Sequence, residues 1–397
     1  MADVAQQRST GKNIVVFCDG TDDQFGQDNT NVVKLLSSAV RQADSQVAFY
    51  DPGVGTFPAP GAWTPIAQWW TKLLGGMVGY GLTQNVATCY DFLMRNYVDG
   101  DRIYIFGFSR GAYTARVLAA LIHACGLLRT YNPNLTTYAI NLFRAEAIGA
   151  KKKNDRDEAR TQHFVPLRLP MCDHFKAVFS VEPTVHFIGV WDTVASVGSI
   201  FNPFKLPFTH WNPSVLNVRH AISIDERRKF FRPNLWSEHQ DGCAVKQIWF
   251  AGVHGDVGGG YPESQSGLAK IALRWMMQEA QACGLELDLE RQRAILGRGS
   301  NEVPPNPYGP MHDELKKPMW KFAQWIPRRM SRRNPATHRY ESYWNFSPVQ
   351  QPRLIEAGSV IHSSVFERIA RPDMHYEPPN LPAYAYDENG HRHPPAT

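Results

Sequence analysis

The residues best able to do chemistry in this sequence are Ser109, Asp192 and His254, which follow one another along the chain in that order. An isolated serine hydroxyl is barely ionised near neutral pH. A serine nucleophile therefore needs a histidine to take its proton and a carboxylate to orient that histidine. Asp192 and His254 each come directly after a predicted strand, as the acid and base of an α/β-hydrolase do. The order and spacing predict a Ser-His-Asp triad.

Ser109 lies in the pentapeptide Gly-Phe-Ser-Arg-Gly at residues 107–111. Residues 102–106 are short, aromatic and β-branched, as in a strand, whereas the apolar residues from Ala112 onward have helical spacing. The glycines at both ends of the pentapeptide remove side chains where a strand turns sharply into a helix. This context predicts a nucleophile elbow with the Ser109 hydroxyl exposed.

A tetrahedral oxyanion formed at Ser109 would need amide donors. The amide of Arg110 is expected at the start of the helix, where the helix dipole favours negative charge. A second donor should come from a loop after an early strand, which Gly20 or Thr21 fits. The Arg110 side chain could also bind a phosphate or carboxylate, or form a salt bridge within the fold.

Other residues could replace members of the triad. His362 is the alternative base, and Asp256 and Asp225 are the alternative acids. Asp192 could instead cap a helix. The order Ser, Asp, His and the strand before each partner favour Asp192 and His254.

Strand and helix patterns alternate from residue 13 to about residue 285. The sequence predicts strands at 13–18, 46–50, 185–190 and 247–253, and helices at 31–40, 83–97 and 267–282. This alternation predicts an α/β fold like that of the α/β-hydrolases, a mostly parallel sheet flanked by helices. We expect a polar tail at 1–12, a catalytic domain at 13–285 with insertions at about 56–81 and 130–180, and an irregular C-terminal extension at 286–397.

Three aromatic segments could shape access to Ser109. Residues 56–81 are rich in Pro, Gly and Trp, and 201–211 form a second such stretch, so that Trp69, Trp70 and Phe204 are candidates for binding the substrate. Residues 56–81 could instead be a packed insertion. Residues 319–333 interleave aromatic and cationic residues, as at an anionic membrane surface, or form a packed segment with a basic rim.

Composition limits the other classes of function. The chain has 397 residues and a net charge of +5, which does not favour specific nucleic-acid binding. The six cysteines include no CxxC pair, so no zinc site is predicted. The acidic loops at 19–23 and around Asp256 could bind Ca²⁺ but lack EF-hand spacing, and no cofactor is predicted. No Sec signal or transmembrane run is visible, which predicts a cytoplasmic protein in the producing cell or export without a Sec signal.

Five motifs taken together resemble one known family, DUF2235, which includes the catalytic domain of the type VI secretion phospholipase effectors called Tle1. The motifs are Phe-Cys-Asp-Gly-Thr at 17–21, Gly-Phe-Ser-Arg-Gly-Ala at 107–112, Trp-Asp-Thr-Val at 191–194, Asp-Glu-Arg-Arg at 225–228 and the glycine-rich run at 249–261. The resemblance implies an α/β-hydrolase fold and phospholipase A type ester cleavage. It also implies Ser109, Asp192 and His254 as the triad.

The sequence therefore predicts a serine ester hydrolase acting on phospholipid acyl esters, with peripheral contact to an anionic membrane. One alternative is a soluble carboxylesterase or depolymerase that cleaves a non-lipid ester. A further alternative is a non-catalytic module that binds membranes or nucleic acid. The oligomeric state is not predicted.

Overall fold

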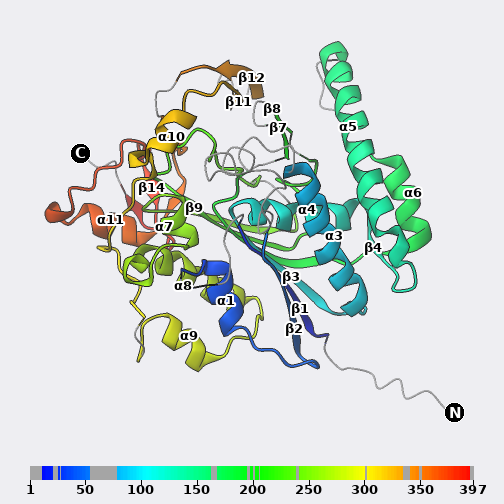
Figure 1. Cartoon of the computed structure of the whole chain (residues 1–397), viewed down its shortest axis with the longest axis horizontal. Helices are drawn as coiled ribbons and strands as arrows, with labels where there is room; N and C mark the ends of the chain where they lie inside the picture. Colours follow the sequence, from blue (N-terminus) through cyan, green and yellow to red (C-terminus); the bar gives the residue numbers. More distant parts are fainter. Residues whose placement is uncertain are drawn as a thin grey trace, which may run out of the picture.

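A nine-stranded sheet forms the centre of the protein (Figure 1). The structure is a computed structural model that describes residues 11–20, 26, 28–53, 78–161, 168–194, 197–199, 202–204, 206–237, 241–299, 302–333, 340–347 and 351–393. The strand order is β15-β14-β13-β10-β9-β6-β3-β1-β2, and every neighbouring pair is parallel except β14 and β15. The carboxyl ends of the parallel strands consequently meet along one edge.

The strands of this sheet come from both halves of the chain. In chain order they are β1 (Asn13–Cys18), β2 (Gln46–Asp51), β3 (Arg102–Phe108), β6 (Val185–Trp191), β9 (Asn217–Ser223), β10 (Ala244–Phe250), β13 (Val360–Ile361), β14 (Ala385–Tyr386) and β15 (Arg392–His393). Short antiparallel pairs lie outside it: β4 (Leu127–Leu128) with β5 (Ser180–Val181), β7 (Val197–Ser199) with β8 (Asn202–Phe204), and β11 (Arg328–Arg333) with β12 (Tyr340–Asn345).

Helices cover both faces of the sheet, which explains why its central strands are apolar on both sides. Ile14 and Val16 of β1 pack toward α3 (Val78–Asn96), α4 (Ser109–Cys125), α5 (Thr136–Thr161) and α6 (Pro170–Phe179). Val15 and Phe17 point the other way, toward α1 (Asn31–Ser38) and α8 (Gly267–Ala282). The first group of helices lies to the right of the sheet in Figure 1 and the second to the lower left.

The segment after residue 285 is joined to the same sheet. It contains α9 (Leu289–Ile295), α10 (Pro318–Ala323) and α11 (Ser363–Ile369), and it supplies β13, β14 and β15 beyond β10. Ile355, Ile361 and Val365 of this segment share a buried cluster with Trp249 of β10. Residues 355–385 are therefore packed as part of the sheet and its core.

Several local predictions agree with the structure. β1 has the predicted bounds, α8 spans the predicted 267–282, and α1 begins after Thr30, whose side chain accepts a hydrogen bond from the Val33 amide. Two segments differ. Residues 130–180, expected as an insertion, contain α5 and α6, and β9 at Asn217–Ser223 is a strand that was not predicted from the sequence.

Insertion 56–81 lies largely outside the described residues, since description resumes only at residue 78. Among the described helices, none combines the length and apolar character needed to cross a bilayer.

Candidate active site

Ser109 occupies a strained turn between β3 and α4. Its φ is 57°, in the left-handed region that disfavours side chains, while Phe108 before it is extended. A Cβ on Gly107 would lie 2.6 Å from the Gly111 carbonyl oxygen, and a Cβ on Gly111 would lie 2.3 Å from the carbonyl oxygens of Cys18 and Asp19. Both positions therefore require glycine, and the loop after β1 lies directly against the start of α4.

Asp192 and His254 are brought together at the carboxyl edge of the sheet, where they follow β6 and β10, the two strands on either side of β9. Asp192 follows β6 and is fully buried, and His254 follows the loop after β10 as the first residue of α7 (His254–Gly258). The Nδ1 atom of His254 lies 2.5 Å from Oδ2 of Asp192. This contact fixes the imidazole so that its other nitrogen, Nε2, faces away from the carboxylate.

Ser109 lies beside this pair. The imidazole of His254 packs on the ring of Phe108, with centroids 4.6 Å apart, and Phe108 directly precedes Ser109. The Val194 amide, two residues after Asp192, donates to the Ser109 carbonyl oxygen at 3.4 Å. Ser109 is half-buried, and Nε2 of His254 is a buried nitrogen without a hydrogen-bond partner among the described residues.

The surroundings favour an ionised acid and a neutral base. Burial alone would raise the pKa of Asp192. The charge of Arg353 and the hydrogen bond from His254 outweigh burial and hold the pKa of Asp192 well below its ordinary value. Burial lowers the pKa of His254 despite the bond to Asp192. Neutral His254 can accept a proton, as a general base must.

Two charged groups near the pair are not among the site residues predicted from the sequence. Arg353 is fully buried, and its Nη1 lies 2.5 Å from Oδ1 of Asp192. Glu226 accepts a hydrogen bond from the His254 amide at 3.3 Å and is paired with Arg228 at 2.7 Å. Glu226 and Arg228 lie in a motif that the sequence singled out only for the family resemblance. Arg353 lies in no motif that the sequence singled out.

The structure describes two of the three predicted oxyanion donors. Arg110 lies in the first turn of α4, as expected. The Gly20 amide donates to Oδ1 of Asp19 at 2.8 Å, and Thr21 lies outside the described residues. Asp19 also accepts from Thr30 and Tyr50, so it braces the loop after β1.

The alternative acids and base have other partners. Asp225 accepts from the Gly252 amide and the Tyr376 hydroxyl, at 2.7 and 2.8 Å. Asp256 lies 2.7 Å from Nδ1 of His312. For His362, Nδ1 lies 2.9 Å from the Ser364 hydroxyl at the start of α11 and Nε2 lies 3.5 Å from Glu388. None of the three is hydrogen-bonded to His254 or Asp192 among the contacts described.

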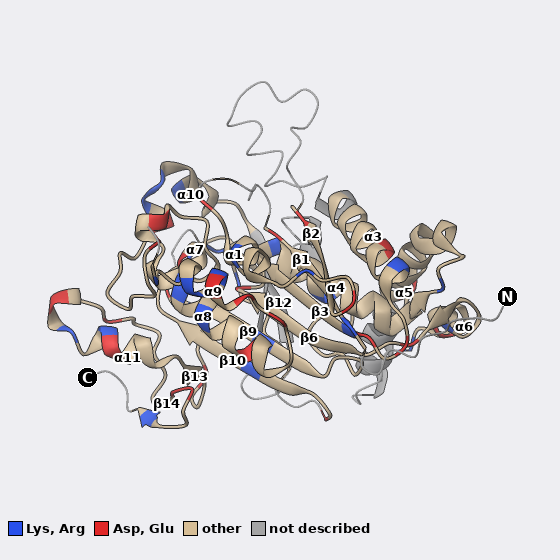
Figure 2. Ribbon diagram, turned by 90° about the horizontal axis from the view of Figure 1, so that it is seen from below, with Lys and Arg blue, Asp and Glu red and all other residues tan. Residues whose placement is uncertain are grey.

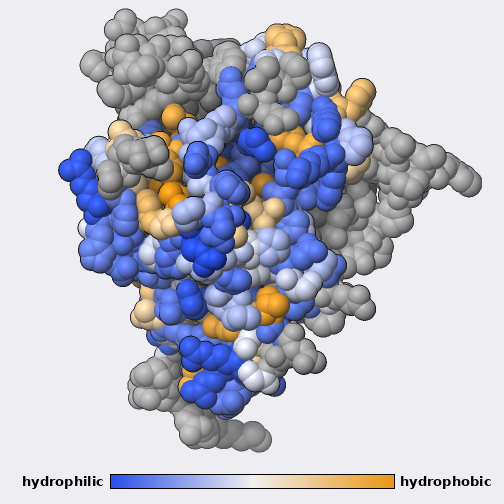
Figure 3. All heavy atoms as spheres, turned by 90° about the vertical axis from the view of Figure 1, so that its left-hand side faces the viewer, coloured by the Kyte–Doolittle hydropathy of each residue, from blue (hydrophilic) through white to orange (hydrophobic). Residues whose placement is uncertain are grey.

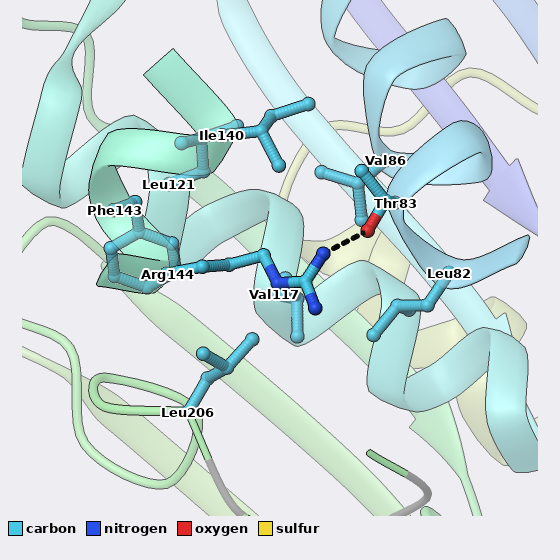
Figure 4. Close-up of a pocket in the computed structure, with 9 residues that line it drawn as sticks. All are labelled: Leu82, Thr83, Val86, Val117, Leu121, Ile140, Phe143, Arg144 and Leu206. Atoms are coloured by element: carbon cyan, nitrogen blue, oxygen red, sulfur yellow. Dashed lines mark hydrogen bonds between the residues drawn. The ribbon is translucent and has the colours of Figure 1, made fainter. Parts of the chain in front are cut away.

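A small apolar pocket lies between α3, α4 and α5 (Figure 4). Arg144 crosses it and donates to the Thr83 hydroxyl at 2.9 Å. Val117 and Leu121 line it from α4, roughly 12 and 18 Å along the helix axis from Ser109. Its volume of about 20 Å³ holds one water molecule and cannot hold an acyl chain. Trp69, Trp70 and the side chain of Phe204, the predicted substrate contacts, are outside the described residues.

Cys18, Asp51 and Cys89 form a buried cluster whose ligand atoms lie within 4.8 Å of one another. The contact with the Cys18 thiol and burial raise the pKa of Cys89, so this thiol is protonated at neutral pH. Asp51 accepts a hydrogen bond from Asn85 at 2.6 Å, and burial raises the pKa of Asp51 to about 6.

The parallel sheet with helices on both faces and the strand-serine-helix turn define a protein of the α/β-hydrolase-like class. Comparison with known proteins is more specific. Residues 12–279 match the family described as "T6SS, Phospholipase effector Tle1-like, catalytic domain". The chain belongs to this family, and the predicted resemblance to the Tle1 catalytic domain is confirmed. Membership supports a hydrolase of the phospholipase type.

The chain also resembles individual proteins. The uncharacterized protein YEL023C of Saccharomyces cerevisiae is 36% identical over 234 residues, which is 56% of this chain and 32% of the yeast protein. The chain thus spans about a third of the length of this curated relative.

Two solved structures are also similar. One, of an uncharacterized protein from Pseudomonas aeruginosa, has a TM-score of 0.39 and 19% identity over 70% of this chain and 46% of that one. The other, of the Tle1 effector bound to the VgrG spike, has a TM-score of 0.40 and 14% identity over 87% and 92%.

Proposed function

We propose that this protein is a serine ester hydrolase that cleaves phospholipid acyl esters, with Ser109 as nucleophile, His254 as base and Asp192 as acid. The observation that carries the proposal is the 2.5 Å contact between Asp192 and a neutral His254 whose ring lies against the residue before Ser109. Ser109 itself is held in a left-handed conformation at the start of a helix. This is the arrangement expected of a nucleophile elbow with its base.

The proposed reaction follows from these positions. Nε2 of His254 takes the proton of Ser109 as Oγ attacks the ester carbonyl, and the imidazolium donates from Nδ1 to Asp192. The Arg110 amide stabilises the oxyanion together with a second donor from the loop after β1. The Gly20 amide donates to Asp19, and Thr21, the other predicted donor of this loop, stays a prediction. His254 then protonates the leaving alcohol, and water that it activates hydrolyses the acyl-enzyme.

A surface suited to an anionic membrane lies near the site and supports a lipid substrate. We call it the α10 surface: Met319, Lys321, Phe322 and Trp325. Phe322 and Trp325 are 65% and 66% exposed, and Lys321 is exposed beside them. Figure 2 shows basic residues along the ribbon near α10. Figure 3 views the molecule from the left-hand side of Figure 1, and on this face hydrophobic residues lie among hydrophilic ones.

Ring contacts link this helix to the catalytic histidine. Trp320, on the buried side of α10, packs edge-on against Phe231 with centroids 5.3 Å apart, and Phe231 packs against His254 at 4.8 Å. Aromatic rings at headgroup depth and cations on lipid phosphates favour an anionic bilayer. Docking of the α10 surface would therefore bring a membrane close to the triad.

The proposal is tested with defined liposomes and a soluble short-chain nitrophenyl ester. Wild type should release fatty acid from the liposomes, detected by mass spectrometry, and a fluorophosphonate should label Ser109 only when His254 is intact. Ser109→Ala should abolish both. Turnover of the soluble ester without stimulation by liposomes would support the soluble carboxylesterase or depolymerase instead. Wild-type turnover by Ser109→Ala would refute the nucleophile.

Delivery is part of the same proposal. The family description concerns type VI effectors, so we propose export without a Sec signal from the cytoplasm of the producing cell. A tagged chain should then reach the medium only when a type VI apparatus is functional. Secretion that is unchanged without the apparatus would refute this route.

A further inference from the structure

Arg353 lies outside the residues that match the family, yet it reaches the predicted catalytic acid. The matching residues end at 279, and Arg353 belongs to the stretch between β12 and β13. Its side chain is fully buried. The Asn380 side chain donates both to the Arg353 carbonyl, at 3.0 Å, and to the Ile224 carbonyl just after β9, at 3.1 Å. This bridge holds the Arg353 backbone at the carboxyl edge of the sheet.

The Arg353 guanidinium makes a fork on the Asp192 carboxylate. Nη1 lies 2.5 Å from Oδ1 and Nη2 lies 3.0 Å from Oδ2. The same two nitrogens donate to the Ser223 carbonyl and hydroxyl, at 3.0 and 2.8 Å, and to the Phe231 carbonyl. The guanidinium thus binds Asp192 on one side and Ser223 and Phe231 on the other. The single ammonium group of a lysine could not bind all of these partners together.

Asp192 is held in one plane as a result. Oδ1 accepts from Arg353 and from the Ser223 amide at 3.0 Å, and Oδ2 accepts from Arg353 and His254. A rotation of the carboxylate would break the Arg353 fork. The orientation of His254 therefore depends on a residue that does not touch it.

We propose that Arg353 is a positioning residue of the active site, which fixes the Asp192 carboxylate so that its Oδ2 atom faces Nδ1 of His254. The inference rests on the proposed function. Arg353 also has an electrostatic effect. Its buried positive charge beside Asp192 opposes the uptake of a proton by the Asp192-His254 pair.

Among the described residues, few charged groups besides Arg353 lie around Asp192 and His254. Glu226, which binds the His254 amide, is paired with Arg228. His220 lies near Asp192, and burial lowers the pKa of His220, so it is neutral there. Arg353 is consequently the cation in direct contact with the catalytic acid.

The test compares Arg353→Met, Arg353→Lys and the control Arg368→Met. Arg368 is a buried arginine of the same C-terminal segment that donates to the Pro307 and Gly309 carbonyls. Three quantities are measured: kcat/KM for the nitrophenyl ester against pH, ionisation of His254 by NMR of ¹⁵N-histidine, and the free energy of unfolding in urea.

Arg353→Met should lower kcat/KM at least about tenfold more at pH 6 than at pH 8, since the pair holds its proton more tightly. His254 should titrate at higher pH in the same variant. Arg353→Lys keeps the charge but loses the fork, so kcat should fall about tenfold or more with KM unchanged and with the pH profile of wild type. Arg368→Met should lose stability with an unchanged pH profile.

Identical pH profiles and His254 titrations in Arg353→Met and Arg368→Met would overturn the inference. If Arg353→Met does not fold, Arg353→Lys decides: wild-type kcat overturns the positioning role and a selective loss of kcat supports it. An inactive wild type would refute the proposed function alone, because the NMR titration of His254 still reports the effect of Arg353.

Discussion

Replacing Asp192 with asparagine should cost both catalysis and stability, for reasons that follow from its four contacts. Arg353 and the Ser223 amide donate to one oxygen, and Arg353 and His254 donate to the other. Whichever way the new amide turns, its NH₂ group faces two donors. If it faces His254, the imidazole must carry its proton on Nε2, where it cannot accept the proton of Ser109.

The magnitudes are large because the site is buried. Loss of the correct tautomer should lower kcat by about 10³- to 10⁴-fold. Leaving the fully buried Arg353 without its carboxylate should also lower the free energy of unfolding by about 3–5 kcal/mol. Both effects arise from one substitution, since Asp192 contacts both the proposed catalytic histidine and the buried arginine.

The assay measures kcat on the nitrophenyl ester and the free energy of unfolding in urea for Asp192→Asn. Asp225→Asn and Asp256→Asn are the controls, because these acids bind Tyr376 and His312 instead of His254. Retention of more than a tenth of wild-type kcat by folded Asp192→Asn would refute the role of Asp192. A loss in the Asp225 or Asp256 variant as large as in Asp192→Asn would transfer that role to the other acid.

Three further predictions concern the pH profile, the elbow and the membrane surface. Because burial lowers the pKa of His254, kcat/KM should rise with pH to a plateau, with a midpoint below the ordinary pKa of histidine. A midpoint above that ordinary value would contradict the assignment. Gly111→Ala should lower the free energy of unfolding in urea by about 3 kcal/mol, since the new Cβ would meet two carbonyl oxygens. The control is Gly149→Ala, which lies in open space on α5 and should leave the free energy of unfolding unchanged or raise it. Replacing Phe322 and Trp325 together with serine should reduce hydrolysis of anionic liposomes about tenfold without affecting the soluble ester. Tyr131→Ser, at another exposed aromatic, is the control, and an equal loss on both substrates would count against the α10 surface.

Much of the sheet and the elbow could be predicted from local patterns. β1, β3 and β6 are short apolar strands, and the glycines at 107 and 111 indicated the close approach that the structure contains. β9 was not predicted as a strand because Arg219 and His220 interrupt its apolar run. Both are buried with partners, Arg219 with Glu279 and His220 with Gln247, which a sequence does not display.

The partners of the triad depended on longer-range information. Asp192 and His254 could be proposed because each follows a strand and because parallel strands end at one edge. Arg353 follows no strand and lies in no motif, and a buried arginine is indistinguishable in sequence from an exposed one. Thr21 and the tryptophans at 69 and 70 stay predictions.

The ion pair between Asp192 and Arg353 also sets an order of events in time. The two residues are 161 positions apart, and a ribosome adds roughly 5–20 residues each second. Roughly 8–30 seconds therefore pass between the synthesis of Asp192 and that of Arg353. During this interval the nascent sheet can form around β1, β3 and β6, but Asp192 still lacks its guanidinium partner. The contacts of the proposed catalytic acid are completed only late in translation.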